Sequence, residues 1–157
     1  IEKSYDLVLF SESFQYVSIK DSLIKIPLLL NENGKLLICD FFRQPGTGTK
    51  PLGGGHDWNV FQDNLKNHSF TNLIDIDITK ETARTYDLIN KLIKDVAVPV
   101  RELSSNYLSS QYPRGMKFLK WYFDKKINRM NRIYFSGNMT GEMFNKLKTY
   151  RILLYKV

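Results

Sequence analysis

The chain has 157 residues, which suffices for one domain, and its hydrophobic share of 43% can fill a core of ordinary size. Its apolar runs, such as Ile26 to Leu30, are far shorter than the roughly 20 residues of a membrane-spanning helix, so such a helix is excluded and a cytoplasmic location is expected. The single cysteine, Cys39, excludes a disulfide framework or a cysteine metal site within one chain, and we expect no metal. The net charge of +7 gathers between Arg101 and Arg132, which indicates one basic face.

The first element is predicted to be a strand. Tyr5 to Phe10 is apolar on successive residues, a pattern typical of a strand covered on both faces within a parallel sheet. A strand of that kind has neighbours on both sides. We therefore expect that residues of the same domain precede Ile1, and that the Tyr5 to Phe10 edge pairs with them or with a second copy.

A helix and a second strand follow. Apolar residues recur every three or four positions between Ser18 and Leu30, which predicts a helix that ends before Gly34. Lys35 to Phe42 has the pattern of another buried strand. A strand, a helix and a strand with short connections form a right-handed parallel crossover, so we expect an α/β fold with an open sheet.

The middle of the chain combines a loop, a strand and long helices. Arg43 to His56 is rich in glycine and proline and is predicted to be irregular, and Asp57 is a good N-cap for a helix after it. Phe70 to Ile78 alternates partly and predicts a third strand. From Glu81 a long helical stretch is expected, with an interruption at Pro99.

The last part of the chain is unusual for its mixture of aromatic and basic residues. Pro113 should interrupt the helical stretch, and Met116 to Ile133 should then form a helix rich in both kinds. Such a helix can bind nucleic acid, lie on an anionic membrane, or cover a hydrophobic substrate, and its aromatic face can also pack on its own domain. A short helix at Thr140 to Leu147 and a final strand at Tyr150 to Tyr155 complete the pattern.

The ordered set of strands resembles one enzyme family. Tyr5 to Tyr16 resembles the fourth strand of class I S-adenosylmethionine-dependent methyltransferases with the turn after it, and Leu30 to Asp40 resembles the segment entering their fifth strand. Ser69 to Thr79 is similar to their sixth strand, and Lys148 to Tyr155 to their antiparallel seventh strand. The resemblance implies a Rossmann-like sheet, S-adenosylmethionine as cofactor, and methyl transfer to O, N or C of a small-molecule acceptor.

The sequence departs from this family in one large respect. The glycine-rich loop after the family's first strand and the acidic residue ending its second strand are both missing. The resemblance therefore implies the C-terminal half of such an enzyme, which we expect to be inactive alone. Residues 1–79 would belong to the α/β core, residues 80–135 to a helical insertion or lid over the carboxyl ends of the strands, and residues 136–157 to the final helix and strand.

The expected site lies beyond the carboxyl ends of the parallel strands, where open α/β sheets bind ligands. By resemblance, Ser11, Glu12, Ser13 and Phe14 should line the cofactor. The Glu12 carboxylate would attract the sulfonium and could accept a proton from the substrate, since methyl transfer needs a free lone pair. The alternatives are that Phe14 packs in the core and that Glu12 is only solvated.

A second candidate general base is His56, which follows three glycines that let the backbone approach another group closely. It can also be a loop residue without a role, and Asp40 can merely cap a turn. The residues expected to bind the substrate are Tyr16, Asp40, Phe42, Arg43 and Trp121.

Two further hypotheses stay open at this point. The chain can be a non-catalytic half-domain that acts in binding or assembly and is completed by another chain. Its basic charge also suggests an RNA methyltransferase, although the sequence contains no obvious RNA-binding motif.

Overall fold

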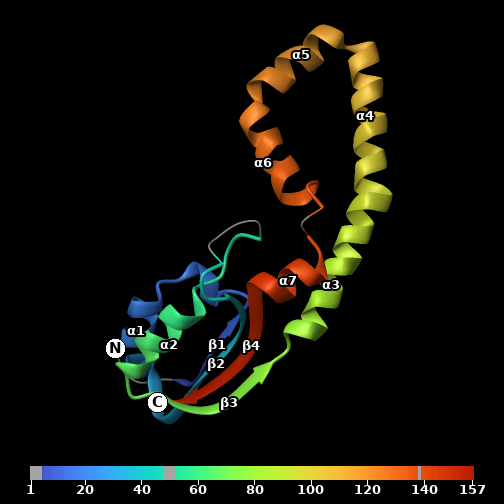
Figure 1. The fold of residues 1–157 in the computed structure, drawn as a ribbon. Coiled ribbons are helices and arrows are strands. Elements are labelled where there is room, and N and C mark those ends of the chain that lie inside the picture. The colour runs from blue at the N-terminus through green and yellow to red at the C-terminus, as the bar shows by residue number, and fades with distance from the viewer. Residues whose placement is uncertain (1–4, 48–51, 138) are drawn as a thin grey trace.

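The computed structural model describes residues 5–47, 52–137 and 139–157 of the chain. Their strands form one sheet in the order β1-β2-β4-β3, from which a long helical arm projects (Figure 1). The strands are β1 (Tyr5–Ser11), β2 (Leu30–Arg43), β3 (Thr71–Asp77) and β4 (Lys148–Lys156).

The strand pairing confirms the α/β fold predicted from the sequence. β1 and β2 are parallel, with Leu7 opposite Lys35, and helix α1 (Ile19–Leu29) connects them. The Oγ of Ser18 accepts a hydrogen bond from the Asp21 N–H at 3.3 Å and caps this helix. β4 lies between β2 and β3 and is antiparallel to both, so the last strand is beside the second, as expected.

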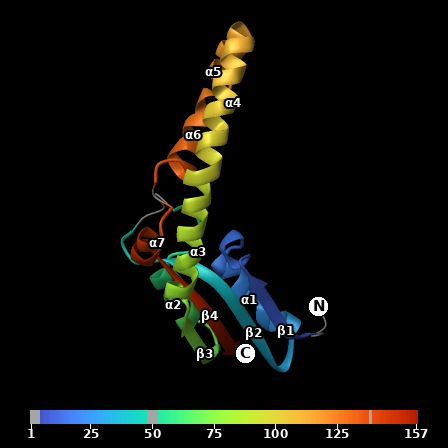
Figure 2. The ribbon, with the colours of Figure 1, turned by 90° about the vertical axis from the view of Figure 1, so that its right-hand side faces the viewer.

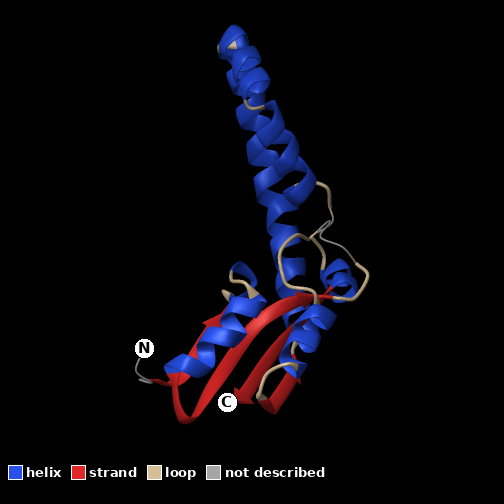
Figure 3. Cartoon of the chain, turned by 90° about the vertical axis from the view of Figure 1, so that its left-hand side faces the viewer, coloured by secondary structure: helices blue, strands red, loops and turns tan. Residues whose placement is uncertain are grey.

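One face of the sheet carries the main hydrophobic core. Helices α1 and α2 (Trp58–Lys66) cover this face (Figure 3). The ring of Phe61 lies 4.9 Å from that of Phe42 and 5.5 Å from that of Phe14, between ring centroids, and all three side chains are buried. Edge-to-face and tilted packing of this kind is typical of aromatic cores.

The opposite face of the sheet is largely uncovered among the described residues (Figure 2). Leu9, Leu37, Leu154 and Ile74 are consecutive partners across the four strands and therefore share this face. Leu9 is 55% exposed and Ile74 is 41% exposed. Within the described chain helices cover only one face and β1 lies at the sheet edge, so the second neighbour expected for the first strand is not among the described residues.

Helix α7 (Gly141–Leu147) packs on α3 (Thr79–Leu92) at one end of the open face. A Cβ atom on Gly141 would lie 2.6 Å from the Ala83 carbonyl oxygen, so the close approach of these helices requires glycine. The N–H of Gly141 donates to Asp87 Oδ1 at 2.8 Å. This contact fixes α3 at the carboxyl end of β2.

The arm begins as one long rod. After α3 the chain makes a π-helical turn, Ile93–Ala97, and continues directly into α4 (Val98–Gln111) (Figure 1). The predicted interruption at Pro99 is therefore not a break. Pro99 is the second residue of α4, where its missing N–H is tolerated, and the wider turn before it accommodates the ring.

Two shorter helices return along this rod. They are α5 (Pro113–Tyr122) and α6 (Asp124–Tyr134), so the helix predicted at Met116 to Ile133 is divided at Phe123. Within the described chain, no residue of α4, α5 or α6 is buried. The aromatic residues of α4, α5 and α6 therefore do not pack into the core of the domain. No described helix is both long and apolar enough to cross a membrane.

Candidate active site

Glu12 is the most distinctive residue at the carboxyl end of β1. Its backbone has φ 51°, in the left-handed region that residues other than glycine rarely adopt. The Glu12 N–H donates to the Cys39 carbonyl oxygen at 2.9 Å, and its Oε1 accepts a hydrogen bond from the Tyr150 hydroxyl at 3.0 Å. Strained backbone conformations are common at functional sites. Here the two hydrogen bonds hold the Glu12 carboxylate in one place.

Tyr150 and Cys39 support this carboxylate from the neighbouring strands. Tyr150 is buried, and the Cys39 Sγ lies 3.7 Å from its hydroxyl and donates to it. Burial, followed by the hydrogen bonds to Cys39 and Glu12, raises the pKa of Tyr150. The phenol therefore keeps its proton and remains a donor to Glu12. Sequence reasoning missed Tyr150, because nothing in the pattern of its strand distinguishes it.

A second tyrosine, at the base of the helical arm, is influenced by the charge of the same carboxylate. Burial and the negative charge of Glu12 raise the pKa of Tyr86 on α3. Its ring stacks on Phe144 of α7 with centroids 4.3 Å apart. The base of the arm therefore contributes to the surroundings of Glu12.

The other residues predicted after β1 separate into two groups. Ser11, Ser13 and Tyr16 are exposed at the rim, and Tyr16 keeps 81% of its surface accessible. Phe14 is fully buried, and its ring packs against Phe61 in the core. We therefore correct the expectation that the Phe14 side chain contacts a cofactor, because it is enclosed on all sides.

Asp40 and Phe42 were expected to bind the substrate and instead stabilise the fold. Asp40 is 1% exposed and accepts hydrogen bonds from the Gln15 N–H at 3.1 Å and the Phe41 N–H at 2.8 Å. Burial raises the pKa of this carboxyl. Its contact with Gln15 holds the 3-10 turn η1 (Phe14–Tyr16), which matches the alternative role of capping a turn. Phe42 is equally buried and belongs to the core.

Arg43 and His56 are tied to the backbone near the rim. The Nε of Arg43 donates to the Gly55 carbonyl oxygen at 2.9 Å, and its N–H donates to the His56 carbonyl oxygen at 2.7 Å. The Nε2 of His56 lies 2.9 Å from the Phe14 carbonyl oxygen. Because a carbonyl only accepts, this nitrogen carries the proton and cannot serve as a base while the bond persists.

The glycine-rich loop approaches the side chain of Lys148. Its Nζ donates to the Gly53 carbonyl oxygen at 2.9 Å and to the Gly54 carbonyl oxygen at 2.7 Å, and it lies 5.1 Å from the centroid of the Phe41 ring. Burial, together with the charge of Arg43, lowers the pKa of Lys148 to about 8. Sequence reasoning missed this residue, which lies at the first position of β4.

The helical arm leaves the sheet on the side of this rim but extends away from it (Figure 1). Trp121 lies on α5 at the far part of the arm and is 74% exposed. The described structure does not bring Trp121, which was predicted to bind the substrate, together with the rim residues. Among residues 5–47, 52–137 and 139–157, no group of His, Cys, Asp and Glu side chains could hold a metal ion.

Comparison with known proteins gives a structural relationship only. No family model matches the chain, and no curated protein sequence matches it. Three solved structures are similar over 99% of the chain. They are a geranyl diphosphate C-methyltransferase from Streptomyces coelicolor A3(2) (TM-score 0.57, 11% identity, 48% of that chain), the cyclopropane synthase MmaA2 from Mycobacterium tuberculosis (0.57, 13%, 57%) and the [4+2]-cyclase SpnF (0.53, 16%, 50%).

These matches establish the fold. The chain has the α/β fold of class I S-adenosylmethionine-dependent methyltransferases, and it spans about half the length of the solved structures it matches. The strand order agrees with the sequence resemblance, since the strand similar to the seventh lies between those similar to the fifth and sixth. A fold can host different reactions, so the chemistry rests on the rim residues.

Proposed function

We propose that the chain is the C-terminal half of an S-adenosylmethionine-dependent methyltransferase that acts on a small-molecule acceptor. The observation that carries this proposal is the structural similarity over 99% of the chain, which includes the antiparallel last strand. Glu12 supports it, because a strained, tethered carboxylate stands at the carboxyl end of β1, where such folds bind ligands.

The described rim fits one side of the cofactor. Ser11 and Ser13 are exposed on either side of Glu12 in the sequence, and their hydroxyls could bond the amino-acid group of the cofactor while the Glu12 carboxylate attracts the sulfonium. When bound, S-adenosylmethionine supplies an electrophilic methyl group on this sulfonium. The described strands have no glycine-rich turn of the kind that would hold the rest of the molecule, so a further part of the protein must provide it.

The residues of this chain then have separate tasks. Glu12 attracts the positive charge and orients it, and the Tyr150 hydroxyl keeps the carboxylate in place. Glu12 is also the rim group that we assign to accept a proton from an O–H or N–H acceptor. Arg43 and His56 fix the loop that borders the rim, through their bonds to Gly55 and Phe14. Alignment of the acceptor is the main catalytic device in this proposal.

Two features of the sheet support a position that we propose for an N-terminal half. β1 is an edge strand, and edge strands present unpaired N–H and C=O groups. The row Leu9, Leu37, Leu154 and Ile74 adds an uncovered apolar face next to that edge. We propose that residues N-terminal to Ile1 pair with β1 and cover this face, which is consistent with matched structures about twice as long.

A second candidate is a non-catalytic half-domain that acts in assembly. One observation favours it, since the chain spans only about half of each matched structure and lacks described residues for most of a cofactor site. The two candidates differ in one measurable property, which is whether the completed protein binds S-adenosylmethionine.

The test compares the 157-residue chain with a version extended by its upstream residues. We expect the extended protein to bind S-adenosylhomocysteine with micromolar affinity in calorimetry, and the chain alone to bind weakly or not at all. In the extended protein, Glu12→Gln should weaken cofactor binding, whereas Glu32→Gln, an exposed site on β2, should not. Failure of the extended protein to bind the cofactor would reject the methyltransferase, and micromolar binding by the monomeric chain alone would reject the half-domain argument.

A further inference from the structure

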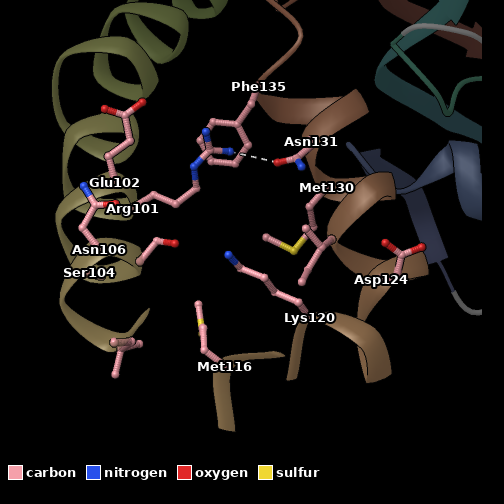
Figure 4. Close-up of a pocket in the computed structure, with 13 residues that line it drawn as sticks. Arg101, Glu102, Ser104, Asn106, Met116, Lys120, Asp124, Met130, Asn131 and Phe135 are labelled. Carbon is pink, nitrogen blue, oxygen red and sulfur yellow. Dashed lines mark hydrogen bonds between the residues drawn. The ribbon is translucent and has the colours of Figure 1, made fainter. Parts of the chain in front are cut away.

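The arm encloses a pocket of its own, remote from the rim residues. It has a volume of about 640 Å³ and lies between α4 on one side and α5 and α6 on the other (Figure 4). Pockets that hold small molecules are typically about 300–1,000 Å³. The function proposed for Glu12 makes no use of this pocket.

The wall of this arm pocket is largely apolar. Leu108, Met116, Ile127, Met130 and Phe135 line it from three helices and the turn after α6. Leu108, Ile127 and Met130 are 40%, 39% and 45% exposed, so their apolar surface faces solvent and can be covered by a ligand. The two methionines are flexible and can adapt to the shape of an apolar chain.

A cation without a protein partner points into this space. Figure 4 shows the Lys120 side chain directed toward the centre of the pocket, near Met130. Among the described residues Lys120 has no hydrogen-bond or ion-pair partner. An ammonium group beside apolar side chains favours an anionic group as its neighbour.

A second cation is fixed at the pocket wall. The Nη1 of Arg101 donates to Asn131 Oδ1 at 2.9 Å, and its guanidinium lies 4.3 Å from the centroid of the Phe135 ring. These contacts hold the guanidinium in place before any ligand arrives. Glu102 and Asp124 also border the pocket, but both carboxylates point away from its centre (Figure 4).

The segment that forms the arm pocket is predominantly basic, although two carboxylates also border the pocket. Residues 101–132 contain eight Lys and Arg against two Asp and Glu, and this net charge of +6 is most of the chain's +7. A positive field of this size attracts anions and repels cations. The apolar wall requires in addition that the anion carry an apolar portion.

We propose that the arm pocket binds an amphiphilic anion, which places a carboxylate or phosphate beside Lys120 and Arg101 and an apolar chain among Met116, Ile127 and Met130. This inference does not depend on the function proposed for Glu12. It can therefore be tested on the protein in the absence of any cofactor.

Ligands that share one part of such a molecule provide the test. We expect laurate, below its micellar concentration, to bind in calorimetry at least about tenfold more tightly than dodecyltrimethylammonium, whose alkyl chain is one carbon longer and whose charge is opposite. Acetate, which lacks the chain, should not bind measurably. Laurate should also bind about fifteenfold more tightly than decanoate, because it has two more methylenes and each buried methylene contributes about fourfold in affinity.

Matched variants on α5 locate the site. Lys120→Met removes the charge and keeps an apolar stem, and it should weaken laurate binding about tenfold. Lys117→Met, on the same helix and outside the pocket, should leave the affinity within about twofold. Circular dichroism of both variants confirms that the helices remain formed.

Three results would overturn the proposal. Equal affinity for laurate and dodecyltrimethylammonium would show that the charge of the ligand is not recognised. Equal weakening by Lys120→Met and Lys117→Met would show general attraction to a basic surface. A short RNA that displaces laurate equally well from the unchanged chain and from Lys120→Met would show the same.

Discussion

The sheet and the arm represent two ways of using aromatic residues in the same chain. In the sheet, Phe14, Phe42 and Phe61 are at most 1% exposed and pack on one another. In the arm, Phe118 and Trp121 are 58% and 74% exposed, with ring centroids 5.9 Å apart. The first group stabilises the fold, whereas the second leaves apolar surface available for binding.

This difference predicts an uneven distribution of stability. Burial of apolar surface is the dominant favourable contribution to folding, and most of the buried apolar residues lie between the sheet and helices α1 and α2, with a smaller cluster between α3, α7 and β4. The arm depends on its own helical hydrogen bonds and on a few contacts such as Arg101 with Asn131. Regions of that kind open locally without global unfolding.

The largest expected effect is in the core. Phe61→Ala should lower the free energy of unfolding by about 3–5 kcal/mol, because it leaves a cavity among Phe14, Phe42 and Tyr155. Urea unfolding followed by near-UV circular dichroism measures it. Val60→Ala, at an exposed position one residue earlier on α2, should change this free energy by less than about 0.5 kcal/mol. Similar losses for the two variants would contradict the assignment of the core to this face.

The elements of the sheet were predictable because their patterns are local. The steps of three and four in α1 and the apolar runs of β1 and β2 determine the crossover, and the strand pairing confirmed it. The exposure of β1 was not predictable from its composition. An apolar run indicates what a strand prefers to contact, and only the rest of the fold determines whether that contact is present.

The site was predictable only in part, for a related reason. Glu12 was identified from its place after β1, but its left-handed backbone and its bond to Tyr150 depend on a strand 138 residues away. Phe14, Asp40 and Phe42 were assigned to ligands because they flank the same rim. Their burial follows from the packing of α2 on the sheet, which no short pattern in the sequence records.

The next largest effect is a pH dependence of stability that arises from Lys148, the buried lysine at the start of β4. The pKa of Lys148 falls from 10.5 to about 8 on folding, so between these values the unfolded chain binds the extra proton and stability rises with pH. We expect a gain of about 1–2 kcal/mol between about pH 7.5 and 9.5 by urea unfolding, because this range covers only part of the interval between the two pKa values.

Two variants check the origin of this slope. Lys148→Met should remove it, and Lys146→Met, an exposed position on α7, should retain it. The range ends below about pH 10 because burial raises the pKa of Tyr155 from 10.0 to about 12, and a raised tyrosine pKa makes stability fall as pH increases further. A slope that persists in Lys148→Met would assign it to another group.

A smaller effect measures the backbone strain at the rim. Glu12→Gly and Glu12→Ala both remove the carboxylate, so their difference reports the cost of φ 51° for a residue with a side chain. We expect the glycine variant to be more stable than the alanine variant by about 1 kcal/mol in urea unfolding. At Glu32, in β2, the same pair should have the opposite order by about 0.5–1 kcal/mol. The same order at both sites would remove strain as a feature of Glu12.

The smallest effect is expected in the arm and completes the comparison with Phe61. Phe118→Ala removes a ring whose centroid lies 6.0 Å from that of the Tyr122 ring. It should nevertheless change the free energy of global unfolding by less than about 0.5 kcal/mol, because an exposed pair on one helix contributes only about 0.2–0.5 kcal/mol. The chain has two tryptophans, Trp58 against the core and Trp121 on the arm, so Trp121→Phe and Trp58→Phe backgrounds report the two regions separately by fluorescence. Hydrogen exchange of the amides of α5 should accelerate in Phe118→Ala, while that of β2 stays unchanged. A loss as large as that of Phe61→Ala, with coincident transitions of both tryptophans, would mean that the arm folds as part of the core and not as a separate binding element.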